Sequence, residues 1–493
     1  MIVRRVAVLA ALCAANGAVR LTAAQSAAPR VTLDAGTLQG ARDSATGVLL
    51  FRGVPYAAPP VGPLRFAPPA PARRWTGVRP AGALGHNCMQ WQPYGDIDPY
   101  AAGVSEDCLY LNVATAGTTG PARPVMVWVH GGGFFAGFGG EERHDPTRLA
   151  RKGAVVVTLN YRLGPFGFFA HPALAGASPR NSSGNYGLLD QIAALQWVKR
   201  NIARFGGDPS RVTVFGESAG GMSVGALVAS PLARGLFRQA ILESGTGIGL
   251  GLLSRDSSLA LGARFAEARL GVPTGAGAAA AARLRALPAD SILAAARAES
   301  RARGGDGTPV FYPVVDGWVL PRRVDAALAE GRANVVPAIV GSNRDEPAVI
   351  FGAPGRSFAR LLAARGAPVY LYQFTRAAED DSAARARGAY HSAEITFVFG
   401  RPRPLLATAG RAPYDSALAE TMSDYWVAFA ATGDPNGPLP NGRPSARPRW
   451  PRYDPATDAS LELGPAVAVR ERVRRAEYDS LDAAGRARGE VRP

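Results

Sequence analysis

A serine between two glycines offers the clearest chemistry in this sequence. The motif is G-x-S-x-G, with Ser218 at its centre and Gly216 and Gly220 on either side. An apolar run at residues 212–215 precedes it, and a helix-favouring segment at 222–229 follows it. A sharp strand-to-helix turn of this kind lifts a serine hydroxyl above the end of a sheet, and glycines leave room for strained backbone. The motif in this context predicts that Ser218 is a nucleophile rather than an ordinary turn serine.

A serine hydroxyl is a weak nucleophile at neutral pH, so it needs a base. In sheets of this kind the three partners follow the order serine, acid, histidine along the chain. The sequence has five histidines, and only His391 comes after Ser218. It lies in a polar stretch at residues 388–394, beyond an expected strand at 369–374. We therefore predict that His391 is the general base, with a structural surface histidine as the alternative.

The acid of such a triad orients the imidazole and stabilises its charged form. It is expected on a loop after a strand that lies between the serine and the histidine. Glu346 fits this place, because it follows the apolar run at residues 336–340. Asp345 is its neighbour and stays open as an alternative, whereas Asp316 stands in a V-D-G-W segment typical of a turn.

A glycine-rich loop supplies candidate donors for an oxyanion. His130 and three glycines directly follow the apolar run at residues 125–129. Glycines let backbone N–H groups approach a carbonyl oxygen closely, and loops of this HGGG type do so in lipases and esterases. We predict an oxyanion hole formed by Gly132, Gly133 and Ala219, and we expect His130 to pack and hydrogen-bond rather than catalyse.

The elements that must position these residues alternate between strands and helices. Continuous apolar runs, typical of strands covered on both faces, occur at residues 125–129, 155–159, 212–215, 240–242, 336–340 and 369–374. Residues 188–205 carry apolar side chains at spacings of three and four, as in a helix with one face on a sheet. This alternation predicts an α/β fold with a mostly parallel central sheet flanked by helices. The stretches 55–80 and 259–303 are expected to be peripheral, the second as helical cap segments that cover the site.

Composition narrows the function classes. The chain of 493 residues has a net charge of +16, but Lys152 and Lys199 are its only lysines and the arginines are scattered. No nucleic-acid-binding motif accompanies this charge, so we expect no nucleic-acid partner.

No apolar run reaches the 18 residues or so of a membrane span. No HExxH or CxxC motif offers a metal site, so neither a metal nor a cofactor is expected. The oligomeric state stays open.

The first residues match a secretory signal. Arg4 and Arg5 precede an apolar run at residues 6–15, and small residues at 22–24 offer a cleavage site. We predict a signal peptide at 1–24, a single domain at 25–493, and export to the periplasm or the medium. An ordinary disordered N-terminus is the alternative, and Arg20 leaves the cleavage point open.

Two cysteines remain if this signal is removed. Cys88 and Cys108 form a pair that, in an exported enzyme, suggests a disulfide. It would close a loop of about 20 residues and stabilise the fold by roughly 3 kcal/mol in the chain-entropy model. Two free buried thiols are the alternative.

Taken together, these motifs resemble those of a known family. The segments HGGGF, GESAGG and GAYHSAE are similar to the type-B carboxylesterase and cholinesterase-like family of α/β-hydrolases, and the similarity extends over about residues 31–465. The resemblance implies hydrolysis of carboxylic esters through an acyl-enzyme on a triad of Ser218, Glu346 and His391. It also implies the disulfide between the two cysteines.

The resemblance extends to residues outside the triad. It implies that Glu106, Asp107 and Arg162 are members of structural ion pairs, and that Ser244 holds the acid in place. One departure concerns the pocket: Glu346 and His391 are only 45 residues apart, where relatives carry a longer helical insert. A missing wall would open the acyl or alcohol side to bulky substrates; the alternative is a defective product that folds poorly.

Three functions fit these residues. The first is a serine hydrolase acting on small-molecule carboxylic esters. The second is a recognition protein that uses the same scaffold without catalysis, although the complete triad argues against it. The third keeps the catalysis but acts on an amide, a carbamate or a thioester. The natural substrate depends on pocket walls at residues 250–335 and 347–368, where the sequence is least informative.

Overall fold

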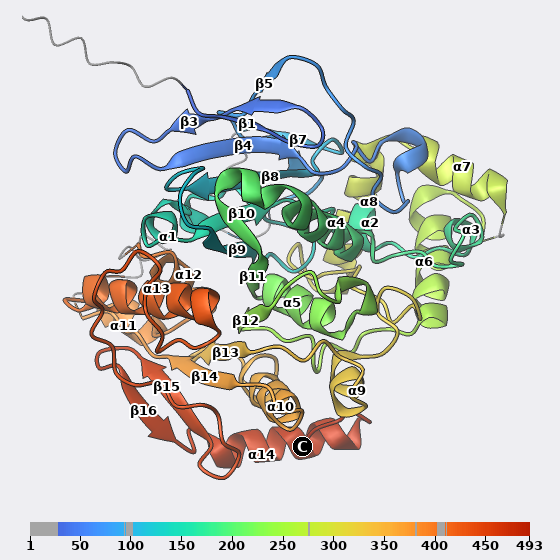
Figure 1. Cartoon of the computed structure of the whole chain (residues 1–493). Helices are drawn as coiled ribbons and strands as arrows, with labels where there is room; N and C mark the ends of the chain where they lie inside the picture. The colour runs from blue at the N-terminus through green and yellow to red at the C-terminus, as the bar shows by residue number, and fades with distance from the viewer. Residues whose placement is uncertain are drawn as a thin grey trace, which may run out of the picture.

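The computed structural model describes residues 28–92, 94, 102–274, 277–379, 382–401, 410 and 412–493. Its largest feature is an eleven-stranded sheet (Figure 1). In spatial order the strands are β16 (Ala468–Glu471), β15 (Ala459–Leu463), β14 (Val369–Phe374), β13 (Ala338–Asn343), β12 (Gln239–Glu243), β11 (Gly207–Glu217), β9 (Arg123–Val129), β10 (Val155–Leu159), β8 (Tyr110–Thr115), β4 (Leu49–Pro55) and β3 (Ala41–Arg42). The predicted signal segment lies outside the described residues.

Seven neighbouring strands pair in parallel, in the spatial order β10, β9, β11, β12, β13, β14 and β15. The pairs at the two edges are antiparallel, β15 with β16 on one side and β10, β8, β4 and β3 on the other. The predicted α/β fold with a mostly parallel central sheet is therefore confirmed. Two smaller sheets contain β1 (Arg30–Thr32), β2 (Thr37–Gln39) and β5 (Val78–Pro80), and β6 (Asn87–Cys88) with β7 (Val104–Ser105).

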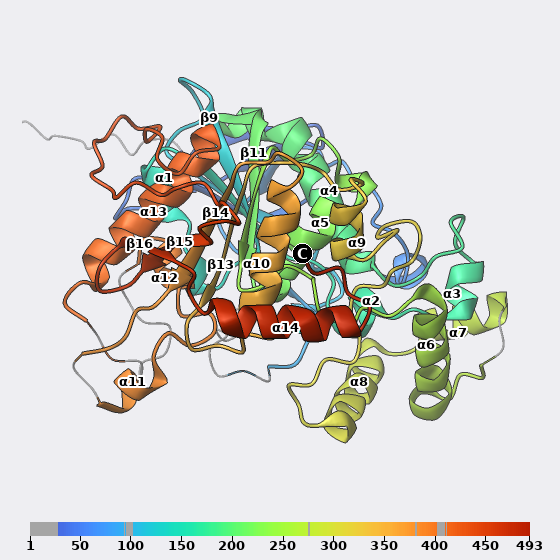
Figure 2. The ribbon, with the colours of Figure 1, turned by 90° about the horizontal axis from the view of Figure 1, so that it is seen from below.

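Helices cover both faces of the large sheet (Figures 1 and 2). They are α1 (Thr147–Arg151), α2 (Gly164–Phe168), α3 (Pro172–Gly176), α4 (Tyr186–Asn201), α5 (Ala219–Ala229), α6 (Arg255–Leu270), α7 (Ala278–Ala286), α8 (Ala289–Arg303), α9 (Val324–Ala329), α10 (Gly352–Ala363), α11 (Ser382–Arg387), α12 (Ile395–Val398), α13 (Asp415–Thr432) and α14 (Arg475–Ala487). Short 3-10 turns occur at η1 (Gly62–Leu64), η2 (Glu142–His144), η3 (Ile202–Phe205) and η4 (Pro231–Ala233).

The sheet separates two hydrophobic cores because successive side chains of a strand point to opposite faces. In β9, Val127 and Val129 pack in the core that contains α4, α5 and α10. Met126 and Trp128 pack in the second core, with α12 and α13. Both faces of the central strands are therefore dry, which explains why their sequences are continuous apolar runs rather than alternating ones.

Two expected elements differ in detail. The strand expected at residues 336–340 begins at Ala338, directly after Pro337, and continues to Asn343. Proline has no N–H to donate to a sheet, so the strand starts beyond it. The helix expected over 188–205 is α4 followed by η3, and Gly206 ends it in the left-handed conformation, with φ of 76°.

The expected cap segment at 259–303 is helical and consists of α6, α7 and α8. Within the described ranges, none of the helices combines the length and the apolar character needed to cross a bilayer.

Candidate active site

Ser218 stands at the sharp turn between the end of β11 and the start of α5. Its φ of 56° and ψ of −124° are strained values for a residue with a side chain. A Cβ atom added to Gly216 or Gly220 would lie 2.5 or 2.0 Å from the carbonyl oxygen of Val129 in the neighbouring strand. Only glycine fits at both positions, which is the physical reason for the G-x-S-x-G spacing.

Three side chains that are distant in the sequence form one chain of hydrogen bonds at this turn. The Nε2 atom of His391 lies 2.9 Å from the Oγ atom of Ser218, and its Nδ1 atom lies 2.8 Å from Oε2 of Glu346. The other oxygen of Glu346 accepts the backbone N–H of Asn343 at 2.9 Å, which fixes the carboxylate against the end of β13. The serine hydroxyl and the carboxylate thus contact opposite sides of one imidazole ring.

The alternative acids lie elsewhere. Asp345 forms an ion pair with Arg344 at 2.7 Å and accepts the N–H of Ala389 at 2.7 Å. Asp316 accepts the hydroxyl of Ser182 and the N–H groups of residues 318 and 320, as expected for a turn residue. Both carboxylates therefore contact other partners than His391.

The glycine loop after β9 lies alongside Ser218. A Cβ atom added to Gly131 would be 3.2 Å from the Cβ atom of Ser218. Gly132 and Gly133 have φ values of 102° and 62°, and an added Cβ at Gly132 would lie 2.2 Å from the oxygen of Ala136. Backbone this strained and this close to its neighbours requires glycine.

His130, at the head of this loop, is buried and packs as expected. Its Nδ1 atom lies 2.8 Å from the Gly131 oxygen, and its ring stacks on Tyr161 with centroids 4.5 Å apart. Burial lowers the pKa of His130 to about 3, so the ring is neutral.

Buried carboxylates surround His391. Besides Glu346, Glu217 lies 3.3 Å from the imidazole Nε2 atom. Burial lowers the pKa of His391, but the carboxylates of Glu217 and Glu346 outweigh it and raise that pKa above its ordinary value. Burial also raises the pKa of Glu217, so histidine and glutamate titrate as a pair. Glu394, which is buried nearby, has its pKa raised to about 7, first by burial and then by the charge of Glu346.

The hydroxyl of Ser244 contacts a different glutamate from the one expected. Its hydroxyl donates to Oε1 of Glu394 at 3.3 Å rather than to Glu346. The other oxygen of Glu394 accepts the side-chain amide of Asn343 at 2.6 Å, and the backbone of Asn343 in turn holds Glu346. Ser244 is therefore linked to Glu346 through Glu394 and Asn343, because its buried hydroxyl contacts Glu394.

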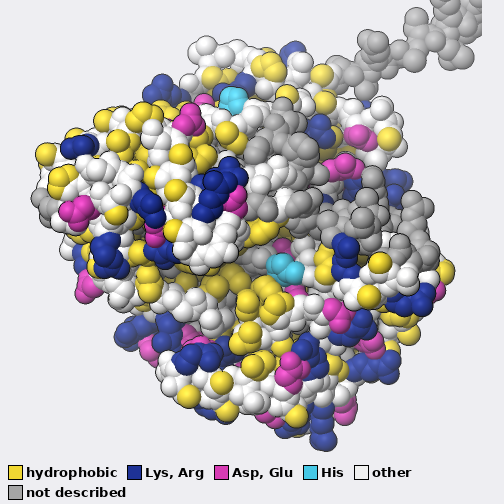
Figure 3. Space-filling view, turned by 180° about the vertical axis from the view of Figure 1, so that it is seen from behind, with side chains coloured by type: hydrophobic (Ala, Val, Ile, Leu, Met, Phe, Trp, Pro, Cys, Tyr) yellow, Lys and Arg dark blue, Asp and Glu magenta, His cyan; other side chains and the backbone are white. Residues whose placement is uncertain are grey.

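A cavity of about 400 Å³ opens in front of Ser218. Its wall includes Gly132 and Gly133 of the loop after β9, together with Met222, Leu250, Tyr312, Ile350 and Phe351. The Phe351 ring stacks on the imidazole of His391 with centroids 4.4 Å apart. Figure 3 shows hydrophobic side chains gathered along a hollow on one face of the molecule. Leu250 and Tyr312 come from the loops before α6 and after α8, and no residue of these three helices is among those that line the cavity, so the helices flank it instead of forming its wall.

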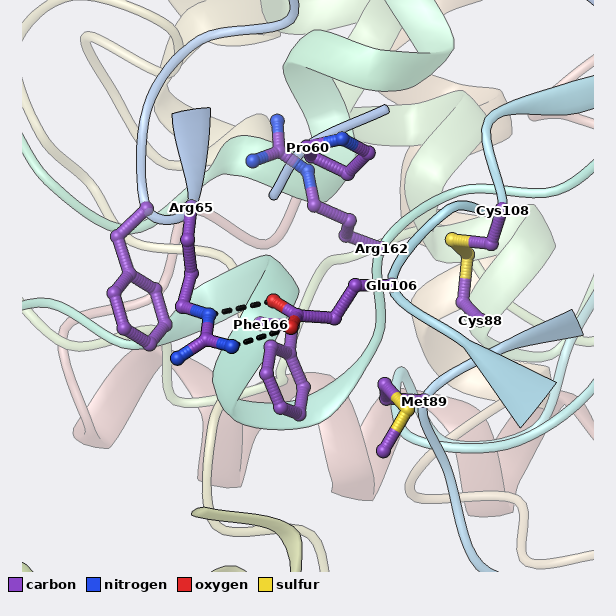
Figure 4. Close-up of a pocket in the computed structure, with 9 residues that line it drawn as sticks. Pro60, Arg65, Cys88, Met89, Glu106, Cys108, Arg162 and Phe166 are labelled. Carbon is purple, nitrogen blue, oxygen red and sulfur yellow. Dashed lines mark hydrogen bonds and ion pairs between the residues drawn. A yellow bond between two sulfur atoms is a disulfide. The ribbon is translucent and has the colours of Figure 1, made fainter. Parts of the chain in front are cut away.

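The acidic and basic residues expected to form structural ion pairs, and the two cysteines, make the following contacts. Cys88 and Cys108 form a disulfide, as predicted. Arg65 forms a two-pronged ion pair with Glu106, drawn beside the disulfide in Figure 4. Arg162 makes the same kind of contact with the buried Asp190, with both distances 2.8 Å.

Asp107 instead accepts the hydroxyl of Tyr110 at 2.8 Å. Its expected ion pair is thus replaced by a hydrogen bond.

Sequence reasoning did not assign roles to Glu217, Glu394 or Phe351. Glu217 and Glu394 stand inside the motifs around Ser218 and His391, so proximity in sequence was the available signal. Phe351 had no such signal, because its contact with the imidazole depends on how the loop after Glu346 folds back. Among the described residues, no group of three or more His, Cys, Asp or Glu side chains is arranged to hold a metal ion.

Comparisons with known proteins show which proteins this chain is similar to. The profile of the carboxylesterase family matches residues 27–351 and 347–481. The chain is 34% identical to a para-nitrobenzyl esterase of Bacillus subtilis (strain 168), over 89% of this chain and 95% of that protein. It is 37% identical to a fumonisin B1 esterase of Sphingopyxis macrogoltabida, over 85% and 84% of the two chains. A solved structure of a PNB esterase superposes with a TM-score of 0.80 at 32% identity, covering 92% of this chain and 99% of the other.

Proposed function

Because this chain belongs to the carboxylesterase family and is a carboxylic ester hydrolase of the serine type, we propose that Ser218, His391 and Glu346 form its catalytic triad. The observation that carries the proposal is the pair of hydrogen bonds on the imidazole of His391, 2.9 Å to Ser218 and 2.8 Å to Glu346. Both distances lie within the range in which a general base removes a hydroxyl proton.

In the acylation step, Oγ of Ser218 forms a bond to the ester carbonyl carbon while its proton passes to Nε2 of His391. Glu346 accepts a hydrogen bond from Nδ1 and stabilises the imidazolium that results. The tetrahedral intermediate then collapses: the bond to the alcohol oxygen breaks, and His391 gives its proton to that oxygen. The acyl group stays on Ser218 as an ester.

We assign the oxyanion hole to the backbone N–H groups of Gly132, Gly133 and Ala219. The carbonyl oxygen gains negative charge in the intermediate, and preorganised N–H donors stabilise it more than they stabilise the neutral ester. Each donor of this kind contributes about 3–4 kcal/mol to lowering the barrier. Ala219 also begins α5, whose N-terminus favours negative charge.

Deacylation repeats these steps with water. His391 removes a proton from the water as its oxygen forms a bond to the acyl carbon, and the collapse returns the proton to Oγ of Ser218. The products are the carboxylic acid and free enzyme. Every proton that moves is carried by the reactants, Ser218 and His391.

The test is Ser218→Ala, assayed with a p-nitrophenyl ester and with a fluorophosphonate probe. Ser210→Ala is the matched control, because Ser210 is an exposed serine in the same strand, β11. We expect Ser218→Ala to lose turnover and labelling but to unfold at the same temperature as the parent. We expect Ser210→Ala to keep both turnover and labelling. Unchanged turnover in Ser218→Ala would refute the assignment. An assay of matched amides, carbamates and thioesters beside the ester decides between substrate classes by kcat/KM.

We further propose that the pocket accepts bulky apolar esters. The side chains of Val349 and Ile350 are 46% and 45% exposed, although Ile350 lines the cavity. Large apolar side chains exposed side by side at a cavity mouth are places where an apolar ligand can bury surface. The short connection between Glu346 and His391 supports this proposal, since the side chains of Val349 and Ile350 remain exposed to the solvent within the described part of the chain. A p-nitrophenyl series from acetate to decanoate tests it: kcat/KM should rise with chain length, and a steady fall would contradict it.

We also propose that residues 1–24 are removed on export and that residues 25–493 form one mature domain. The disulfide between Cys88 and Cys108 supports an oxidising compartment. N-terminal sequencing of the protein from a periplasmic or culture fraction tests this, and the expected first residue lies near Gln25. Protein found only in the cytosol with residue 1 intact and two free thiols would contradict it.

A further inference from the structure

The last helix of the chain crosses the helix that follows the catalytic-site loop. Helix α14 runs over α10, as Figure 2 shows, and residues 488–493 continue beyond it. We call residues 475–493 the C-terminal strap. The family match ends at residue 481 and is divided at residues 347–351. The strap therefore carries residues outside the family match, and it packs beside the point where that match is broken.

The first contact between the strap and the site is apolar. Tyr478 is buried and forms a small cluster with Ala348 and Ala353, against which Leu481 also packs. A Cβ atom added to Gly352 would lie 2.5 Å from the Tyr478 hydroxyl, so the ring rests directly against the start of α10. Tyr478 therefore contacts the loop of residues 346–351 through Ala348. This loop has the proposed triad acid, Glu346, at one end and Phe351 at the other.

Buried ion pairs fix the strap to α10. Arg356 of α10 contacts Asp482 at 2.8 Å and Asp479 at 2.6 Å, both on α14. Ser357 donates its hydroxyl to the other oxygen of Asp482 at 2.8 Å. Arg356 and Asp482 are both almost completely buried, and buried charges keep their positions closely because any displacement leaves one of them unpaired.

The end of the strap contacts the start of α9 and the residue next to Leu250, which lines the cavity. The backbone N–H of Val491 donates to Asp325 at 2.7 Å, and Arg323 donates to the Gly489 oxygen at 2.6 Å. The buried guanidinium of Arg492 lies against Gly249, where an added Cβ would be 2.8 Å from its Nη2 atom. Gly249 directly precedes Leu250, which lines the cavity with Ser218.

We propose that the C-terminal strap is a positioning element of the active site, in which Tyr478 and Arg492 hold the two wall loops that present Phe351 and Leu250 to the cavity. The proposal rests on the proposed function, since it concerns the same His391 imidazole on which Phe351 stacks. Tyr478 contacts Ala348 and Gly352 on either side of Phe351, and Arg492 contacts the residue before Leu250, so the position of the strap affects where these two side chains lie. Small displacements of a catalytic ring cost rate because the reacting atoms must be aligned.

The test uses Tyr478→Ala and Arg492→Gln, with Ser480→Ala as the matched control on the exposed face of α14. With p-nitrophenyl butyrate below each variant's unfolding temperature, we expect kcat to fall about 10- to 100-fold in the first two, with KM changed less than about threefold. Tyr478→Phe keeps the ring and should restore kcat. The control should match the parent in both constants.

The outcomes separate the two proposals. If Ser218→Ala is inactive while Tyr478→Ala and Arg492→Gln unfold at lower temperature but keep the parental kcat and KM, the strap only stabilises the fold and our inference is overturned. If Ser218→Ala keeps turnover, the proposed function fails instead. Should Tyr478→Ala not fold, Tyr478→Leu and Arg492→Gln decide the matter by the same kinetic criterion.

Discussion

Replacing Glu217 with glutamine should shift the pH dependence of the reaction. Glu217 lies 3.3 Å from Nε2 of His391, and its carboxylate raises the pKa of the imidazole. The base must be neutral to accept the serine proton, so a raised pKa moves the acidic limb of kcat/KM to higher pH. Glutamine keeps the shape of the side chain but carries no charge. Glu217→Gln should therefore move the acidic limb to lower pH.

The separation of the two groups sets the size of this shift. Two unit charges 3.3 Å apart interact by about 1.3 kcal/mol in bulk water and by about 5 kcal/mol at an effective dielectric constant of 20. One pKa unit corresponds to about 1.4 kcal/mol, so the expected shift is about 1 to 4 pH units. The His391 side chain is 35% exposed, and burial raises the pKa of Glu217, so that this carboxyl is charged over only part of the assayed pH range; we therefore expect a value near the lower limit.

The assay is kcat/KM for p-nitrophenyl acetate between pH 5 and 9, followed at the isosbestic wavelength of p-nitrophenol. Glu394→Gln is the comparison, because its carboxylate contacts Asn343 and Ser244 and contributes less to the His391 pKa than Glu217 does. Its limb should move less. A Glu217→Gln limb that stays in place, or moves to higher pH, would refute the electrostatic reasoning.

Three further predictions concern the rest of the site. Replacing Cys88 and Cys108 together with alanine should lower the free energy of unfolding by about 3 kcal/mol, because the disulfide closes a loop of 20 residues; urea unfolding checks this, and an unchanged midpoint would contradict it. Gly220→Ala should abolish ester turnover, since the new Cβ would lie 2.0 Å from the Val129 oxygen and displace the turn; parental kcat would show that the turn can relax. Ile350→Asp should lower the octanoate-to-acetate ratio of kcat/KM about 10-fold or more, because it places a charge on the exposed apolar mouth; side-by-side assays check it, and an unchanged ratio would remove this residue from the substrate path.

The sequence by itself was enough to predict most of the strands and helices and to select the candidate residues of the triad. Strands buried on both faces and helices with one apolar stripe have local patterns, so the α/β fold could be predicted from periodicity. The turn at Ser218 depends on Gly216 and Gly220, two positions away on either side, and this spacing is also a local pattern. His391 could be selected because it is the only histidine after that serine, and the order of the three partners follows from the topology of the sheet.

The tertiary structure decided what depends on the directions of side chains. Ser218 and His391 are 173 residues apart, and their 2.9 Å contact exists only because parallel strands end at one edge of the sheet. Glu346 and Asp345 are chemically alike in the sequence, and only the path of the loop turns the first toward the imidazole and the second toward Arg344. Long-range packing also places Glu217 beside His391 and Glu394 beside Ser244, and it forms the contacts of the C-terminal strap. Local periodicity does not encode such packing.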